Sequence, residues 1–481
     1  MCCSSRWLRV MIRILMLLSA GLYAASAHAQ LNGGNQGANQ GANQGGNLGG
    51  NQAGGANQAG GILIDAAGVV RSAGPSTDSA KLLKQQQSAF VDQHLSGELS
   101  ATSERRYVSL VRLEQACIDA IDRGEPPGED MRNLAGLLQI QYVFVDPDGH
   151  DLVLAGPAEG FAPDASGRMT GLNSGRPPLR IDDLMVALQA VASGASAMGC
   201  SIDPEPERLA RMQQFIRQNS SATSSEVVAQ RYRQMGQILG MQNVTVFGVP
   251  ADSHFAVTLV EADFRMKRIS LGVEPSGVRG LPSHLSLLKP NGNSIQRWWF
   301  TPFYESLSMT DDRTAFHLSG QRVQLLAQDE ISNATGQRSN AAFTRASTQA
   351  FARMFTDKFP ALAGQSPVFA ELQNLFDLAI IAALLKQERL PRLVGWDMSL
   401  FLNPDSDLIP RYAVPREVES ASTFRQANRG LLLGLIGGVT IEPSQVLRDI
   451  KSDSEPGLRL DGQQRAVTDS RPAEADRWWW D

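Results

Sequence analysis

Cysteine is scarce in this sequence of 481 residues, which contains four cysteines and six histidines. Cys2 and Cys3 lie at the extreme N-terminus, in a segment that we expect to be removed, so Cys117 and Cys200 remain. In an oxidising compartment these two residues can form one disulfide, or each can be buried as a separate thiol, and spacing alone leaves both alternatives open. Neither has a second cysteine or histidine at ligand spacing, so we predict no metal site.

Basic charge is also in short supply. The chain has 44 Lys and Arg residues against 49 Asp and Glu residues, a formal net charge of -5. Nucleic acids and anionic membranes attract basic surfaces, so we expect no nucleic-acid partner. A glycine-rich phosphate loop after a strand is absent as well, and we expect no cofactor. The sequence identifies no partner; an envelope protein and a glycan both remain open.

Long apolar runs are absent after the N-terminus. A basic segment ending at Arg13 is followed by the apolar run 14–25, and Ala27-His28-Ala29 then offers a cleavage site. This pattern predicts a signal peptide over 1–29, cleavage near Ala29 and a secreted or periplasmic protein, with an uncleaved anchor as the alternative. The later apolar run 375–385 is too short to span a membrane, so we expect a buried helix and no transmembrane segment after cleavage.

Composition divides the rest of the chain into four parts. Residues 30–61 are rich in Asn, Gln and Gly, with almost no apolar side chains to bury, and are predicted to be a disordered tail. Residues 62–178 are expected to form an N-terminal α+β domain, in which 140–155 forms a hairpin around an Asp-Pro-Asp-Gly turn. Residues 179–450 are expected to form a central and C-terminal α+β domain, and 451–481 a polar tail that ends in RWWWD.

The predicted fold class is α+β, a mixed core of strands and helices with an antiparallel meander and C-terminal helices. Aromatic and β-branched runs separated by turn residues between 297 and 327 predict the meander. Apolar residues at helical spacing predict the two closing helices, over 340–359 and 368–387.

The central stretch 241–272 reads as a buried strand, a tight loop and a long amphipathic helix that ends at Gly272. Ion pairs four residues apart, Glu261 with Arg265 and Asp263 with Lys267, are expected along the helix. Ser253 and His254 lie at its start, where free backbone N–H groups can accept an anion; a capped surface turn is the simpler interpretation.

Tryptophan pairs and a tryptophan triplet are the remaining candidates for contact with a ligand. Trp298 and Trp299 are neighbours on a predicted strand, so they face opposite ways and at most one lines any given surface, while core packing is the alternative. Trp478, Trp479 and Trp480 lie on a polar tail and need an apolar surface. They are expected to fold back onto the protein itself or to dock into a partner.

Several stretches together resemble exported bacterial proteins that carry domain of unknown function 1598. They are GILIDAAGVVR, IQYVFVDPDGHDLVLAGPAEGF, GCSIDPEPERLARMQQF, VPADSHFAVTLVEADFRMKRISLGVEP, RWWFTPFYESLSMTDDRTAFHLSGQRVQLLAQDE and the final RWWWD. The resemblance implies an exported, envelope-associated protein. It implies no activity and supplies no catalytic residues.

Two functions therefore compete. The first is a non-enzymatic envelope or secreted binding or structural protein, favoured because the sequence contains no motif that specifies a reaction. The second is a hydrolase with His254 or His317 as the base and an acid such as Asp263 or Glu274. This second function requires those groups to meet in one pocket.

Overall fold

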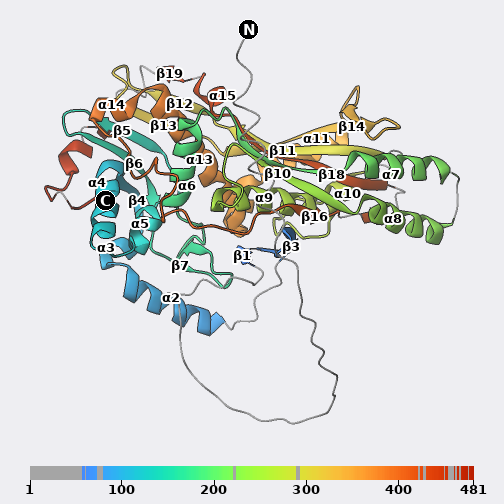
Figure 1. The fold of residues 1–481 in the computed structure, drawn as a ribbon, viewed down its shortest axis with the longest axis horizontal. Coiled ribbons are helices and arrows are strands. Elements are labelled where there is room, and N and C mark those ends of the chain that lie inside the picture. The colour runs from blue at the N-terminus through green and yellow to red at the C-terminus, as the bar shows by residue number, and fades with distance from the viewer. Residues whose placement is uncertain are drawn as a thin grey trace, which may run out of the picture. The chain divides into compact units, whose positions relative to one another are not determined.

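The computed structural model describes residues 57–59, 61–72, 80–219, 221, 224–288, 293–420, 423–425, 430–448, 450–452, 460, 463–464, 467–474 and 476–481. The expected signal peptide and most of the expected tail lie outside these residues. Gly54–Asp481 form one compact unit, so the segments 62–178 and 179–450 belong to the same unit (Figure 1). Its mixture of helices and strands is α+β, which confirms the predicted fold class.

A large mixed sheet forms one half of this unit. Its described strands run in the order β1-β2-β3-β16-β10-β9-β18-β11-β14-β15, and β17 pairs with β18. Most neighbours are antiparallel, but β11 pairs with β18 in parallel, as does β16 with β3. The strands are β1 (Asn57–Ala59), β2 (Ile62–Ile64), β3 (Val69–Ser72), β9 (Met198–Pro204), β10 (Met241–Phe247), β11 (Asn293–Phe303), β14 (Arg322–Ser332), β15 (Arg338–Asn340), β16 (Glu417–Glu419), β17 (Thr423–Arg425) and β18 (Gly430–Ile441).

A second sheet is built around the predicted hairpin. Its order is β19-β12-β13-β5-β6-β4-β20, and its strands are β4 (Ser103–Ser109), β5 (Tyr142–Asp146), β6 (Asp151–Ala158), β12 (Ser306–Met309), β13 (Ala315–Ser319), β19 (Lys451–Ser452) and β20 (Trp479–Trp480). The expected meander is therefore divided: β11 and β14 belong to the large sheet, whereas β12 and β13 join β5. A short hairpin, β7 (Phe161–Pro163) and β8 (Met169–Gly171), stands apart.

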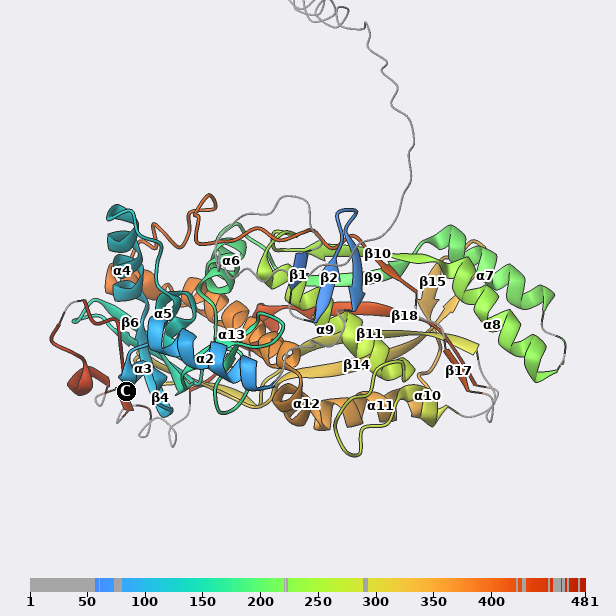
Figure 2. The same cartoon turned by 90° about the horizontal axis from the view of Figure 1, so that it is seen from below.

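Helices pack on these sheets and between them. They are α2 (Ala80–His94), α3 (Gly97–Ser100), α4 (Leu110–Asp122), α5 (Glu129–Arg132), α6 (Ile181–Ala192), α7 (Pro206–Gln218), α8 (Ser225–Leu239), α9 (His254–Leu271), α10 (His284–Leu287), α11 (Ala346–Asp357), α12 (Phe359–Gln365), α13 (Pro367–Gln387), α14 (Leu390–Val394) and α15 (Pro443–Leu447). Figure 2 shows α10, α11 and α12 aligned along one side of β11 and β14. Phenylalanines fill that interface: Phe300 of β11 packs with Phe355, Phe359 and Phe369.

The helix α13 confirms the buried helix expected near 375–385. Among the described helices it has the length and apolar composition needed to cross a membrane, but 94% of its most apolar window is buried inside the fold. It contacts α6, α9 and α12, and so occupies the centre of the unit. A helix that is apolar on every face is expected in such a position.

The strand, loop and helix expected over 241–272 are confirmed as β10, a short loop and α9. Ser253 is the N-cap of α9, and Gly272 ends the helix in the left-handed region. Two details were wrong. β10 is half-exposed and not covered on both faces. Glu261 pairs with Arg168 from a distant loop, not with Arg265, because α9 is buried almost all round and its acids face neighbouring segments.

The end of the polar C-terminal tail, RWWWD, is part of the fold. Trp479 and Trp480 pair with Val108 and Tyr107 of β4 and so extend the second sheet. Trp478 and Trp480 are buried, and the ring of Trp480 stacks on Tyr107 with centroids 5.5 Å apart. The alternative that the three tryptophans fold back onto the protein is therefore the one that the structure adopts. Similarly, β1 occupies the end of the segment expected to be a free tail.

The buried His284 provides a test of this fold through pH. Its ring packs between Trp298 and Phe351, with centroids 5.0 and 5.8 Å away. Burial, assisted by the charge of Arg345, lowers the pKa of His284 to about 3. Below about pH 6.5 the unfolded chain therefore takes up a proton that the folded chain does not, and stability falls as the pH falls.

We expect this histidine to cost about 2 kcal/mol of unfolding free energy between pH 6.5 and pH 5. The variant His284→Phe should lose correspondingly less over that interval in urea titrations. His94→Gln is the control, because His94 is exposed on α2. Parallel pH curves for wild type and His284→Phe would contradict the assignment.

Candidate functional site

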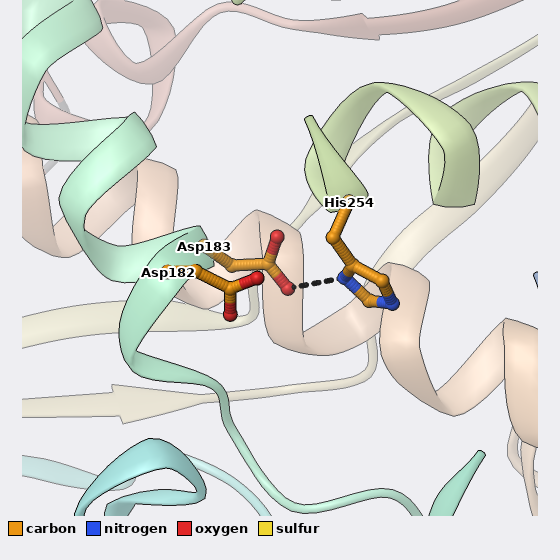
Figure 3. Close-up of side chains that lie close together, drawn as sticks. All are labelled: Asp182, Asp183 and His254. Carbon is orange, nitrogen blue, oxygen red and sulfur yellow. Dashed lines mark hydrogen bonds and ion pairs between the residues drawn. The ribbon is translucent and has the colours of Figure 1, made fainter. Parts of the chain in front are cut away.

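His254 opens the helix α9, and its ring points toward the first turn of α6 (Figure 3). Its Nδ1 lies 2.8 Å from Oδ2 of Asp183. The neighbouring Asp182 accepts two hydrogen bonds from the guanidinium of Arg180, at 2.9 and 2.8 Å. Two acids in the first turn of a helix also suit the positive end of its dipole. An imidazole and two carboxyls from segments about 70 residues apart are thus brought together.

Arg168 closes the same cluster from the loop between β7 and β8. One Nη donates to Oε2 of Glu261 on α9 at 2.7 Å, and the other donates to Glu371 on α13. Glu261 also accepts the backbone N–H of Gly61 at 3.0 Å. The side chains of Arg168, Glu261 and Glu371 are all nearly buried. The guanidinium therefore joins the loop to two core helices.

A cavity of about 90 Å³ lies between these groups. It has room for a few water molecules. Its wall is polar, and the side chains that carry its chemistry are Arg168, Arg180, His254, Glu261, Glu371 and Tyr412.

Burial is the main cause of the pKa shifts of both His254 and Asp183. Burial, together with the charges of Arg180 and Arg168, lowers the pKa of His254 well below its usual value. Burial also raises the pKa of Asp183 to about 7, although Arg180 opposes this. The imidazole is therefore uncharged at neutral pH. Its Nε2 faces the hydroxyl of Thr258 at 3.5 Å and Oε1 of Glu371 at 3.8 Å.

The same three side chains could in principle hold a metal ion. Asp182, Asp183 and His254 offer ligand atoms that lie within 4.8 Å of one another. However, Arg180 already occupies both oxygens of Asp182, and Asp183 is engaged with Nδ1. A cation would have to displace both interactions against a nearby positive charge, so the donor set does not fit a resident metal.

The structure places Ser253 and His254 differently from the expected anion site. The Ser253 hydroxyl donates to the carbonyl of Pro250 at 2.6 Å and accepts the N–H of Ala256 at 3.2 Å. Ser253 is 1% exposed, so it serves as a helix cap and offers nothing to a ligand. The ring of His254 faces a carboxyl, which would repel an anion.

The other residues suggested for a hydrolase do not meet His254. His317 stacks on Tyr142 in the second sheet, with ring centroids 4.7 Å apart. Asp263 pairs with Lys267 at 2.7 Å, as expected, and Glu274 pairs with Arg265. The acid that does meet His254 is Asp183, which sequence reasoning missed. A pair of acids at the start of a predicted helix was visible, but nothing in the sequence linked it to His254.

The two cysteines correct the disulfide alternative. Both thiols are free and buried. Cys117 lies on α4, 4.0 Å from the sulfur of Met131, whereas Cys200 lies on β9 in the large sheet. Burial raises the pKa of Cys117 to about 12 and raises that of Cys200 further. Thiols held in this protonated state are poor nucleophiles.

Trp298 and Trp299 face opposite ways, as the strand period predicts. Trp298 is fully buried, and its ring meets Phe351 edge-on at 5.1 Å, so it is a core residue. Trp299 is half-buried on the other face of β11 and belongs to none of the core clusters of the described residues. The guanidinium of Arg297 lies over its ring at 5.1 Å.

The register of the sheet shows what surrounds Trp299. Its neighbours across the strands are Leu326 on β14 and Gly438 on β18, followed by Ser201 on β9 and Thr245 on β10. A second row beside it contains Gln324, Thr301, Thr440, Gly199 and Phe247. We call these ten positions the Trp299 face. Their side chains point away from the core side of the sheet, where Cys200, Trp298, Phe300 and Val439 are buried.

The side chains of the Trp299 face are partly open to solvent. Thr245 and Leu326 are exposed, and Gly199 and Gly438 are buried. The other six positions, Ser201, Phe247, Trp299, Thr301, Gln324 and Thr440, are half-buried. The ring of Phe247 lies over Gly199, where a Cβ would come within 2.5 Å of it. Among the described helices, α7 and α8 cover this side only beyond Ile436, with which they form a small separate core at one end of the sheet. Figure 1 shows these two helices side by side at that end.

Comparisons with known proteins give one family. No curated protein and no solved structure matches the chain. The family model described as "Protein of unknown function (DUF1598)" matches residues 200–284, which run from β9 to the start of α10. The match contains Ser201, Thr245, Phe247 and His254, and so includes part of both the cavity lining and the Trp299 face. The chain therefore carries a DUF1598 segment, and that family has no known function.

Proposed function

We propose that this is an exported, non-enzymatic binding protein of the cell envelope, and that the Trp299 face is its binding surface. The observation that carries the proposal is that Trp299 and Phe247, two half-buried aromatic side chains, lie on the side of the large sheet that the described helices cover at one end only. Aromatic side chains outside any core cluster are typical of surfaces that meet a partner. The leader-like sequence 1–29 supports export.

The polar cavity beside His254 favours this function over catalysis because its arginines are already paired with carboxylates. Arg168 is neutralised by Glu261 and Glu371, and Arg180 is neutralised by Asp182. Groups committed to each other in this way hold segments together. They leave little to stabilise a charge that develops on a substrate.

Export and envelope binding are tested separately. Fractionation of the host cell should place the protein outside the cytoplasm, and N-terminal sequencing should begin near Gln30. The purified protein should then sediment with host-cell envelope. Trp299→Ala should lose most of that sedimentation. Phe343→Ala should keep it, because Phe343 is 76% exposed and lies outside the Trp299 face. Equal sedimentation of all three proteins, or of none, would refute the proposed surface.

A second candidate function is hydrolysis at His254. It is favoured by the Asp183–His254 hydrogen bond of 2.8 Å, which orients the imidazole with Nε2 toward the cavity side. An uncharged imidazole so oriented can act as a general base toward water. The test is turnover of generic ester, peptide and glycan substrates by wild type and by Asp183→Asn. Turnover that falls about a hundredfold or more in the variant would favour catalysis, and absence of turnover in both would remove it.

A further inference from the structure

The chemistry of the Trp299 face identifies the class of ligand that it fits. Four of its ten positions carry hydroxyls (Ser201, Thr245, Thr301 and Thr440), and Gln324 carries an amide. Two more are aromatic, Leu326 is aliphatic, and Gly199 and Gly438 carry no side chain. None of the ten is charged. Two charged side chains border the ten positions on the same side of the sheet. Arg297 is stacked on the Trp299 ring, and Asp203 is paired with Arg338 at 2.9 Å.

We propose that the Trp299 face binds a neutral glycan of the cell envelope; this rests on the proposed function and names its ligand. A sugar ring presents apolar C–H groups on one side, which pack against an aromatic ring, and hydroxyls at its edge, which need uncharged donors and acceptors. Trp299 and Phe247 supply the rings. The serine, threonines and glutamine between and beside them supply the hydrogen bonds.

The spacing of the two rings fits a chain and not a single sugar. Trp299 and Phe247 are separated by three strand steps, from β11 through β18 and β9 to β10. Because neighbouring strands lie about 4.8 Å apart, the two rings are separated by about 14 Å across the sheet. Between them lie two buried glycines, Gly199 and Gly438, and the half-buried Ser201 and Thr440, whose hydroxyls a ligand can reach. An oligosaccharide that lies across the strands would contact both rings and the hydroxyls of Ser201 and Thr440 at the same time.

Other occupants fit this face less well. A nucleic acid needs several phosphate-binding cations, and the ten positions contain none. A second copy of the chain would need a larger apolar centre, since interfaces between identical subunits are mostly apolar. An acidic glycan would find a single cationic side chain, Arg297, to pair with its carboxylates. The neutral, hydroxyl-bearing composition therefore selects a neutral polyhydroxylated ligand.

The experiment uses the purified protein and host-cell envelope pretreated in one of two ways. Periodate cleaves the vicinal diols of glycans, and a broad protease removes envelope proteins. We expect periodate to abolish sedimentation, protease to leave it intact, and 0.5 M salt to weaken it by less than about twofold, because salt screens charged contacts only. Trp299→Ala and Phe247→Ala should each weaken binding about tenfold or more, whereas Phe343→Ala should leave it unchanged.

The outcomes separate this inference from the proposed function. If protease abolishes Trp299-dependent sedimentation and periodate does not, the partner is a protein; the glycan is then ruled out while the binding surface stands. If high salt abolishes binding, the ligand is charged and the neutral glycan is overturned. If the wild-type protein does not sediment with untreated envelope, both the glycan inference and the proposed envelope-binding function are refuted. Circular dichroism of each variant confirms that a loss reflects the surface and not the fold.

Discussion

Replacing Arg106 by alanine is expected to destabilise the protein by about 3–5 kcal/mol, because several backbone carbonyls lose their donor at about 1–3 kcal/mol for each one left buried and unsatisfied. Arg106 is fully buried on β4, beside the edge strand β20 of the second sheet. Its guanidinium donates to both oxygens of Asp481, at 2.8 and 3.0 Å, and also to backbone carbonyls of 98, 99, 101 and 135. The change would leave those carbonyls without their donor and would release the C-terminal strand β20 from β4.

Urea unfolding of Arg106→Ala measures this loss of stability. Two further variants show how much of the loss comes from the ion pair and how much from the burial of Arg106. Asp481→Asn keeps the shape of the side chain but removes its charge; because Asp481 is 39% exposed, we expect about 1 kcal/mol. Arg477→Ala removes an arginine just before β20 whose pair with Glu98 is exposed, and should cost less than about 1 kcal/mol. Equal losses for Arg106→Ala and Arg477→Ala would show that burial of Arg106 does not matter.

Arg168→Ala is expected to have a comparable effect, about 3–5 kcal/mol, for a related reason. Glu261 and Glu371 are 2% and 5% exposed in their side chains, and each depends on Arg168 for its counter-charge. Without the guanidinium, two carboxylates stay buried beside each other. Thermal unfolding should therefore begin with loosening of the loop between β7 and β8, which Arg168 ties to α9 and α13.

Double variants make the Arg168 prediction specific. Adding Glu371→Gln to Arg168→Ala removes one of the stranded charges, so the double variant should be more stable than Arg168→Ala alone. Arg411→Ala is the matched control, because its pair with Asp252 is exposed and should contribute about 1 kcal/mol or less. A double variant that is less stable than the single one would mean that Glu371 is not destabilised by losing Arg168.

Much of the local structure could be read from the sequence. The periodicity of 254–271, with Ser253 before it and Gly272 after it, defined α9 to within a residue. The Asp-Pro-Asp-Gly turn fixed the hairpin of β5 and β6. The alternation along β11 placed Trp298 and Trp299 on opposite faces. These features depend on residues that are close together in the chain, whose backbone preferences and side-chain period act locally.

The pairing of distant segments could not be read in this way. Nothing local indicated that Asp183 would meet His254, or that Glu261 would choose Arg168 over Arg265 four residues away. Nor did anything local show that Asp481 would reach Arg106. Such pairs form because folding brings charged groups into a low-dielectric interior, where an unpaired charge is costly and the nearest available counter-charge is taken.

By itself, then, the sequence determined the α+β class, the positions of most helices and strands, and the opposite orientations of neighbouring strand residues. The tertiary structure alone decided which faces stay open. In the part of the chain that the structure describes, α9, α10 and α11 pack on the other side of the large sheet, whereas α7 and α8 cover one end of the side that carries the Trp299 face. Strand order and helix placement arise from long-range packing of the whole unit, so a period-two pattern can say that Trp299 faces away from Trp298 but not whether anything covers it.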